Sequence, residues 1–327
     1  MKQDGSFKNE REFTIWLEKR TRQQARGLVL GIGDDAALVE PRAGQMLVLT
    51  SDLSIEGTHF TGALHPAEAV GHRALARSLS DIAAMGATPR FALISLALSR
   101  RVSGAWIKAF YAGVLRLAGR FGVVIAGGDT ATGMKQTAVD VTVIGEAARA
   151  GVLLRSGARP GDSIFVAGEL GLSARGLRLL KQKTRARNAQ CRSAIHAHLY
   201  PEPQCALGTY LARAGLASAA IDVSDGLSTD LTRLAEASRV GACIESDRIP
   251  APGNRSGDCR WGAISPVALA LSGGEDYKLL FTVPEARARL APRRFKGVRI
   301  YRIGEIREAR YGISILRNGK AVPLKPS

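Results

Sequence analysis

The sequence predicts an α/β protein of two domains. Its 327 residues are more than a single hydrophobic core usually supports, and they fit two domains of roughly 150 residues each. Hydrophobic residues make up 46% and charged residues 23%, which excludes disorder, coiled coil and collagen as the main state. Strand-like and helix-like segments alternate along the chain, as they do in α/β proteins. We place the domain boundary near residue 150, which gives domains 1–150 and 151–327.

The first domain alternates short apolar strands with amphipathic helices. Strands are predicted at 46–50, 91–98, 123–126 and 139–144, and helices at 66–85 and 105–120. Pro66 suits the first turn of a helix and Gly86 suits the end of one. Residues Ile107, Phe110 and Val114 recur at helical spacing in the second helix.

The second domain repeats this alternation after a turn at 159–162. We expect strands at 163–167, 219–223 and 279–283, and helices at 173–180 and 227–238. The segment 181–192 is polar, and we expect it to form a loop.

No apolar run approaches the ~20 residues that span a bilayer, and the N-terminal residues lack an apolar signal core. We therefore expect a cytoplasmic protein with no membrane partner. The four cysteines, Cys191, Cys205, Cys243 and Cys259, form no C-x-x-C pair, so neither a zinc ribbon nor a disulfide framework is expected.

The chain is strongly basic, with 46 Lys and Arg against 29 Asp and Glu, a formal charge of +17. Such a surplus attracts anions, among them nucleic acid, membrane surfaces and phosphorylated metabolites. Free use of Arg in a high-GC genome gives the same surplus. The Arg-rich stretches at 175–192 and 287–302 do not interleave aromatic residues in the manner of a stacking platform, so a nucleic-acid partner is not expected.

Acidic residues collect at the predicted strand ends. Asp35, Asp52 and Asp129 follow strands in the first domain, Asp222 and Asp225 end a strand in the second, and Glu275 precedes another strand. Ligands of open α/β sheets bind beyond the carboxyl ends of strands. Converging carboxylates repel unless cations lie between them, and Mg²⁺ takes oxygen ligands that it shares with phosphates. Asp81, late in a helix where the dipole disfavours a carboxylate, fits the same hypothesis.

Other interpretations of these residues exist. Asp is common in turns and helix caps, so Asp162 and Asp225 could each be structural. Residues 31–36 match G-x-G-x-x-A, but their two carboxylates would lie where a dinucleotide pyrophosphate needs bare amides. A Walker A loop, protein-kinase motifs and a Ser-His-Asp pattern are all absent from the sequence.

The histidines also allow both a functional and a structural interpretation. His196 and His198 lie in a polar stretch and are expected to be solvated. His59 follows the Asp52 turn closely and is either a donor to an anionic substrate or an ordinary surface residue.

Seven short blocks in order along the chain resemble the thiamine-monophosphate kinase family. They are GIGDD at 31–35, SD at 51–52 with EGTHF at 56–60, LSDIAAMGA at 79–87, GGDT at 127–130, LRSG at 154–157, DVSDGL at 222–227 and SGGEDY at 272–277. The resemblance implies the two-domain aminoimidazole ribonucleotide synthetase-like fold, with an N-terminal α/β domain that binds ATP and dimerises through its sheet, and a C-terminal α/β domain.

It also implies a reaction, in which ATP phosphorylates thiamine monophosphate to thiamine diphosphate, assisted by several Mg²⁺ ions. The family's metal ligands correspond to Asp35, Thr50, Ser51, Asp52, Asp81, Asp129, Asp222 and Asp225. Its ATP contacts correspond to Tyr111, Gly128, Asp129, Arg155 and Ser224, and its substrate contacts to His59 and Glu275. The acceptor is already an anionic phosphate, so no catalytic residue beyond these ligands is expected.

The sequence departs from the family at three points. It ends without the aromatic tail that packs over the thiamine rings, Ser78 stands where Asn is frequent, and Lys278 replaces a common acid. Two alternatives stay open: a sister enzyme such as aminoimidazole ribonucleotide synthetase, and a non-catalytic anion- or nucleic-acid-binding protein on this scaffold. A selenophosphate synthetase is disfavoured because no Cys precedes residue 191.

Overall fold

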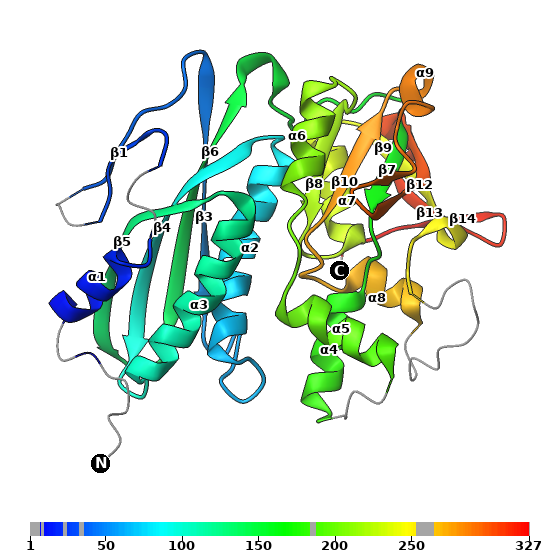
Figure 1. Cartoon of the computed structure of the whole chain (residues 1–327). Coiled ribbons are helices and arrows are strands. Elements are labelled where there is room, and N and C mark those ends of the chain that lie inside the picture. The colour runs from blue at the N-terminus through cyan, green and yellow to red at the C-terminus, as the bar shows by residue number, and fades with distance from the viewer. Residues whose placement is uncertain are drawn as a thin grey trace. The chain divides into compact units, whose positions relative to one another are not determined.

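The computed structural model describes residue 7 and residues 10–21, 25–32, 36–183, 188–252 and 265–326. The chain forms two compact units (Figure 1). The first comprises Met1–Ile82 and Ala87–Ala150, and the second Ala83–Gly86 and Gly151–Ser327.

The first unit holds three helices and six strands among its described residues. In chain order they are α1 (Glu10–Glu18), β1 (Leu28–Leu30), β2 (Leu38–Val39), β3 (Gln45–Ile55), α2 (Ala67–Ala84), β4 (Thr88–Ser99), α3 (Gly104–Phe121), β5 (Val124–Met134) and β6 (Ala138–Ala148), followed by a 3₁₀ turn, η1 (Arg149–Gly151). The predicted helices 66–85 and 105–120 are both present, each within a residue or two of its predicted bounds.

A four-stranded sheet, in the order β3-β6-β4-β5, supports this unit. Only the β4–β5 pair is parallel; β3 and β4 both run antiparallel to β6. Helices α2 and α3 lie against one face (Figure 1), where α2 buries Leu75, Leu79 and Ile82. The two helices cross where each presents a glycine: a Cβ on Gly71 would lie 2.0 Å from the Phe110 carbonyl oxygen, and one on Gly113 would lie 1.9 Å from that of Glu68. This close approach fixes α2 over the sheet.

Two strands extend well past their predicted ends. The strand predicted at 46–50 continues to Ile55, and the strand predicted at 123–126 continues to Met134. Asp52 and Asp129 therefore lie inside strands, and the prediction that they end strands is wrong. The cause is pairing: β6 pairs with β3 along its whole length, out to Ile55 opposite Ala138. Polar residues and glycines resemble a turn in the sequence, but a long partner strand holds them extended.

The second unit is built on a larger mixed sheet. Its elements are β7 (Ser163–Ala167), α4 (Leu172–Lys181), α5 (Ala189–Leu199), α6 (Cys205–Arg213), β8 (Ala219–Val223), α7 (Leu227–Ser238), β9 (Gly241–Glu245), η2 (Ser246–Arg248), α8 (Pro266–Ser272), β10 (Lys278–Val283), α9 (Glu285–Ala288), β11 (Arg294–Phe295), β12 (Val298–Arg307), η3 (Ala309–Tyr311), β13 (Ile313–Arg317) and β14 (Lys320–Pro323). The strand order is β14-β13-β9-β12-β7-β10-β8, with β11 paired to β12.

Several predicted elements of this unit have the observed bounds, and one prediction fails. The strands 163–167 and 219–223 and the helix 227–238 are confirmed to the residue. The predicted loop 181–192 is wrong in its last residues, because α5 begins at Ala189. Its signal is a cap: the side chain of Asn188 accepts a hydrogen bond from the Cys191 N–H at 2.8 Å.

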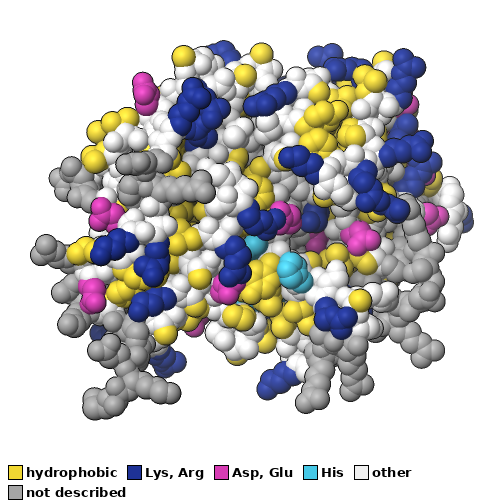
Figure 2. Space-filling view, viewed as in Figure 1, with side chains coloured by type: hydrophobic (Ala, Val, Ile, Leu, Met, Phe, Trp, Pro, Cys, Tyr) yellow, Lys and Arg dark blue, Asp and Glu magenta, His cyan; other side chains and the backbone are white. Residues whose placement is uncertain are grey.

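The mixed α/β class is confirmed, since both units combine helices with mixed sheets. No helix within the described residues has the length and apolar character needed to cross a membrane. Cys191, Cys205 and Cys243 are free thiols, and Cys259 lies outside the described residues. Lys and Arg side chains are spread over the face shown in Figure 2, interspersed with apolar and acidic ones.

Candidate active site

A seam of polar side chains joins α2 to the edge strand β3. This polar seam consists of Thr50, Asp52 and Ser54 of β3 and Arg77, Ser78 and Asp81 of α2. On a strand, alternate residues face the same side, and on a helix, residues three or four apart do. The two spacings bring the two rows face to face at the margin of an otherwise apolar interface.

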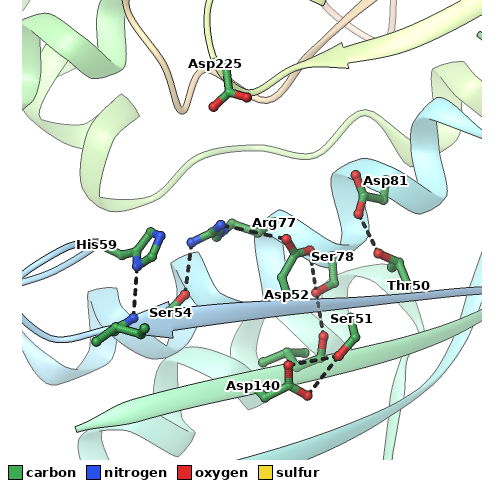
Figure 3. A network of polar contacts seen from close by, with 12 residues as sticks. Thr50, Ser51, Asp52, Ser54, His59, Arg77, Ser78, Asp81, Asp140 and Asp225 are labelled. Carbon is green, nitrogen blue, oxygen red and sulfur yellow. Dashed lines mark hydrogen bonds and ion pairs between the residues drawn. The ribbon is translucent and has the colours of Figure 1, made fainter. Parts of the chain in front are cut away.

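Each member of the seam has a partner across it (Figure 3). Thr50 Oγ1 donates to Asp81 Oδ2 at 2.5 Å, and Arg77 Nη1 donates to Ser54 Oγ at 3.2 Å. Ser78 Oγ lies 3.1 Å from Asp52 Oδ2 and 2.8 Å from the Val141 carbonyl oxygen. Ser78 of α2 therefore bridges Asp52 of β3 and the backbone of the neighbouring strand β6.

A cation–carboxylate contact partly offsets the negative charge of the seam. Arg77 Nη2 lies 3.8 Å from Asp52 Oδ1, and both side chains are partly exposed. A partly exposed pair at this distance is a weak ion pair, so Asp52 remains available to another cation.

His59 lies beyond the end of β3 beside two arginines of α2. Its Nδ1 accepts the Ile55 N–H at 3.0 Å, so a neutral ring carries its proton on Nε2, an atom that can donate to a phosphate oxygen. Arg73 and Arg77 line the same small recess, and Arg73 Nη2 donates to the His59 carbonyl at 3.4 Å. His59 is thus part of a basic recess rather than an isolated surface histidine.

The side chain of Ser51 points to the opposite face of the sheet from Thr50 and Asp52. Its Oγ lies 2.9 Å from both carboxylate oxygens of Asp140 and 3.0 Å from Thr142 Oγ1 (Figure 3). The structure does not bring this hydroxyl together with the polar seam, because adjacent residues on a strand face opposite sides.

A cavity of about 860 Å³ opens between α1, the β1–β2 segment and the sheet. Tyr111, Gly128 and Asp129 line it, three of the predicted ATP contacts. Tyr111 packs against Phe13 and Trp16 of α1, with ring centroids 5.7 and 6.0 Å apart, and burial raises the pKa of its phenol above the usual range. The cavity therefore combines an aromatic wall with a glycine-rich strand.

Gly128 holds β5 against β4 in a way that no other residue could. Its φ is 147°, and a Cβ there would lie 1.9 Å from the Ile94 carbonyl oxygen. The register between the strands shifts by one residue just before it, between Ala92 and Leu93. A bulge of this kind redirects side chains, and here it precedes Asp129.

In the second unit, Asp222 lies near the end of β8, and Ser224 and Asp225 occupy the turn from β8 into α7. A buried residue that the sequence analysis did not single out, Asp230, organises that turn: its Oδ2 accepts the N–H groups of Ser224 and Asp225, each at 2.9 Å. Burial raises the pKa of the Asp230 carboxyl, and these hydrogen bonds oppose the shift.

Arg233 also belongs to this turn. It donates to Asp225 Oδ2 at 2.5 Å and to Asp230 Oδ1 at 2.9 Å. Asp222 is buried on β8, whereas Asp225 is exposed. The predicted ligands therefore differ in how far water reaches them.

Glu275 lies in a strained loop between α8 and β10. Its φ is 68° and that of Tyr277 is 50°, conformations that cost a non-glycine residue about 1–3 kcal/mol each. Between them Asp276 is buried, and its carboxylate accepts the Gly171 N–H at 2.5 Å and the Ser173 N–H at 3.0 Å. A strained backbone of this kind persists where the surrounding contacts leave the loop no other conformation.

One predicted exposure is wrong. His198 was expected to be solvated, but it is buried, and its Nδ1 lies 3.0 Å from Ser173 Oγ and 3.8 Å from Glu275 Oε2. The polar sequence around it hides the fact that α5 packs on α4. His196 is exposed, as expected. Arg155, a predicted ATP contact, is also exposed.

Oxygen ligands of the kind that Mg²⁺ prefers are present in both units, as carboxylates and a threonine hydroxyl. No group of three His, Cys, Asp or Glu residues within the described ranges converges closely enough to hold a metal by itself. Asp35 lies outside those ranges. The donor set fits a hard cation that completes its shell with water or phosphate oxygens.

Some residues of these sites could have been found in the sequence. Arg77 and Arg73 lie four and eight residues before Asp81, a predicted ligand, and so share one face of α2 with it. Phe13 and Trp16 of α1 carried no comparable signal, since nothing in their spacing indicates a distant partner such as Tyr111.

Comparison with known proteins identifies the family. Residues 33–147 match the AIR synthase related protein, N-terminal domain, and residues 159–316 match the corresponding C-terminal domain. The thiamine-monophosphate kinase of Bacillus subtilis is 39% identical over 78% of this chain and 77% of its own length, and that of Escherichia coli K12 is 36% identical over 93% and 92%. The chain belongs to the thiamine-monophosphate kinase family.

Solved structures agree with this membership. The thiamine-monophosphate kinase of Stenotrophomonas maltophilia K279a superposes with a TM-score of 0.82 at 35% identity, covering 94% of this chain and 96% of that one. AaThiL in complex with AMPPCP and TMP gives 0.76 at 32% identity, covering 97% and 95%. A hydrogenase maturation protein, HypE in complex with ATP, shares the fold at 20% identity with a TM-score of 0.75.

Proposed function

We propose that this protein is an enzyme that transfers a phosphoryl group from ATP to thiamine monophosphate, giving thiamine diphosphate and ADP. Relatives that match over more than nine tenths of their own length are thiamine-monophosphate kinases. The observation that carries the proposal is the polar seam beside the basic recess, because it combines carboxylates for cations with donors for phosphate in one unit.

Magnesium is the cation that this donor set would take. Asp52 and Asp81 with Thr50 offer ligands on the first unit, Asp129 offers one at the cavity, and Asp35 and Ser51 belong to the same predicted set. Asp222 and Asp225 are the candidates on the second unit. Bound Mg²⁺ would neutralise the charge of ATP and let two anionic phosphates approach.

ATP is proposed to occupy the 860 Å³ cavity, whose size suits a nucleotide. Tyr111 and Phe13 form its aromatic wall, and Gly128 and Asp129 bring strand backbone to its lining, where we propose that the nucleotide lies. Arg155 and Ser224 are proposed as further contacts: Arg155 offers an exposed guanidinium, and a guanidinium is a two-pronged donor to phosphate.

The acceptor phosphate is proposed to bind at the basic recess. His59 donates from Nε2, and Arg73 and Arg77 supply charge that draws a phosphate toward the seam. Glu275 carries the opposite charge and suits the cationic thiazolium of thiamine.

Little chemistry beyond positioning is needed. The nucleophile is an oxygen of a phosphate that is already anionic, so no general base has to remove a proton from it. The residues of the seam and recess then align the two phosphates for in-line transfer and prevent them from adopting unproductive orientations.

A homodimer is proposed on the open face of the first unit's sheet. Leu47, Leu49 and Leu53 alternate along β3 on the side away from α2, and Leu49 is 63% exposed. A row of exposed leucines on an edge strand is unfavourable in water. A second copy of the same sheet, packed against this row, would bury it. We place the enzyme in the cytoplasm, where ATP is supplied.

The test is ADP release with Mg²⁺ and ATP in the presence of thiamine monophosphate, thiamine or formylglycinamidine ribonucleotide, with products identified by chromatography. Turnover with thiamine monophosphate alone supports the proposal. Turnover with the ribonucleotide would instead identify a sister synthetase. A folded protein that binds ATP, is silent with all three and binds DNA in a salt-dependent manner would identify an anion-binding protein on this scaffold.

A further inference from the structure

We propose that Asp276 and the buried Ser173–His198 pair are positioning residues, which fix the strained loop and the carboxylate of Glu275 for recognition of the cationic end of the acceptor. The inference rests on the proposed function, since it takes Glu275 to contact the thiamine rings. It concerns the second unit alone.

Asp276 anchors the loop from inside the protein. Both of its carboxylate oxygens are engaged by backbone N–H groups, those of Gly171 and Ser173 at the start of α4. The side chain is buried, so this carboxylate cannot reach a ligand. Its hydrogen bonds instead join the loop to the N-terminus of a ten-residue helix.

The anchor determines what its neighbours do. With Asp276 pulled inward, Glu275 and Tyr277 on either side both adopt φ angles that favour glycine. The N–H of Glu275 donates to the Ser224 carbonyl at 2.7 Å, and that of Tyr277 to the Val223 carbonyl at 2.9 Å. The loop is therefore held at alternate points, and Glu275 has no freedom to relax its backbone without losing one of them.

The Glu275 carboxylate lies beside a buried pair of polar side chains. His198 Nδ1 lies 3.0 Å from Ser173 Oγ and 3.8 Å from Glu275 Oε2; the longer separation exceeds a hydrogen bond, and a protonated ring would attract the carboxylate across it. Because His198 and Ser173 are both buried, their positions are set by packing of α4 against α5. The start of α4 thereby supports the loop backbone directly and places His198 beside the Glu275 carboxylate.

The result is a preorganised carboxylate. Of the two adjacent acids, Asp276 uses both carboxylate oxygens in hydrogen bonds inside the protein, whereas the Glu275 side chain is 25% exposed. A carboxylate held before the ligand arrives loses less conformational entropy on binding a cation than a mobile one. This arrangement predicts an effect on affinity for the acceptor that is separate from affinity for ATP.

The experiment compares steady-state kinetics of the full-length enzyme with four variants: Asp276→Asn, His198→Leu, His198→Asn and Asp162→Asn. An asparagine in place of His198 keeps a polar atom near the position of Nδ1, whereas leucine fills the buried space without one. Asp162 is the matched control, because it too is buried and accepts a backbone N–H, that of Arg159, but at the far end of β7.

We expect KM for thiamine monophosphate to rise about tenfold in Asp276→Asn and His198→Leu, with KM for ATP unchanged. His198→Asn should restore most of the affinity, and Asp162→Asn should leave both constants as they are. Hydrogen exchange supplies a readout independent of turnover: the Glu275 and Tyr277 amides should exchange faster in Asp276→Asn and not in Asp162→Asn.

Outcomes for the two proposals are distinguishable. A wild-type enzyme that does not turn over thiamine monophosphate overturns the proposed function. An active wild type whose Asp276→Asn and His198→Leu variants match Asp162→Asn in both KM values and in amide exchange overturns the inference and leaves the function standing. Equal rises in both KM values would likewise contradict it, since they would indicate a structural role only.

Discussion

The two units place their acidic residues by different means. In the first unit, Asp52 and Asp81 project from a paired strand and a long helix, so regular backbone positions them and short side-chain contacts hold them. In the second, Asp225 and Glu275 lie in turns, and buried aspartates, Asp230 and Asp276, hold those turns through backbone N–H groups. The first arrangement is rigid by its secondary structure, and the second is rigid only through its anchors.

This difference separates two kinds of mutational effect. An acid on a sheet can be replaced without altering the fold, so loss of function at such a position reports on chemistry. An acid that anchors a turn supports other groups, so its replacement changes residues that it never touches.

Replacing Asp52 tests the sheet-borne arrangement. Asp52→Asn should lower turnover by about 100-fold or more, because a charge aimed at the reacting phosphates is worth a few kcal/mol in the transition state. The melting temperature should change little, since asparagine can still accept from Ser78. Kinetics and a thermal melt on the same sample measure both quantities.

Asp140→Asn is the matched control, an aspartate on the next strand whose carboxylate faces the opposite side of the sheet. Its turnover should stay near that of the wild type. Near-normal turnover in Asp52→Asn, or an equal loss in Asp140→Asn, would remove Asp52 from the site.

Gly128→Ala sharpens the idea that backbone geometry positions the first unit's site. The new Cβ would meet the Ile94 carbonyl oxygen at 1.9 Å, so β5 must move away from β4. We expect the free energy of unfolding to fall by about 2–4 kcal/mol and ATP affinity to fall with it. Gly133→Ala on the same strand has a positive φ of 99° but no atom within 4 Å of the added Cβ, so it reproduces the strain without the clash. Denaturant unfolding and ATP titration should show a clearly smaller effect there.

The open face of the same sheet gives the next test. Leu49→Glu should convert the dimer to a monomer, because two copies would bring like charges into an apolar contact. Leu290→Glu is the control, an equally exposed leucine, 57% against 63%, in the second unit. Sedimentation equilibrium measures the mass of each. A Leu49→Glu variant that keeps the mass of the wild type would place any interface elsewhere.

The anchored turn predicts a modest pH effect. Burial raises the pKa of Asp276 from 3.8 to about 6. The folded state therefore holds this proton to higher pH than the unfolded chain, and the stability that it contributes is present below pH 4 and lost as the pH rises through 6. Relative to Asp276→Asn, the wild type should lose roughly 2–3 kcal/mol of unfolding free energy between pH 4 and pH 7. Urea titrations at both pH values measure it, and a constant difference would contradict the assignment.

The sequence predicted most helices and strands of the first unit, although it misjudged the lengths of two strands, and only five of the fourteen helices and strands described in the second unit. Apolar runs such as 91–98 carry their own signal, whereas Asp52 and Gly128 resemble turn residues, and only the distant partner strand keeps them extended. The expectation that acids lie at strand ends held for Asp222, the last residue but one of β8, and failed for Asp52 and Asp129 in the first unit. Thr50, Asp52 and Asp81 fall in the polar seam and Gly128 and Asp129 line the cavity, and their binding of metal and ATP stays a prediction.

Buried polar groups were the hardest to foresee. Asp230 and His198 lie in segments whose composition resembles a solvated surface, and their burial follows from helix packing that no local pattern contains. Ser51 shows the converse limit: its neighbours in sequence indicated a shared site, and the alternation of a strand turned its side chain to the other face.

The most direct test of the whole account follows the γ-phosphate itself. The protein would be mixed with [γ-³²P]ATP, Mg²⁺ and thiamine monophosphate in a single turnover, and the labelled products separated. The account predicts that the label appears in the terminal phosphate of thiamine diphosphate and not as inorganic phosphate. Label released as inorganic phosphate, or retained on ATP while the protein binds both ligands, would contradict direct transfer between the two substrates.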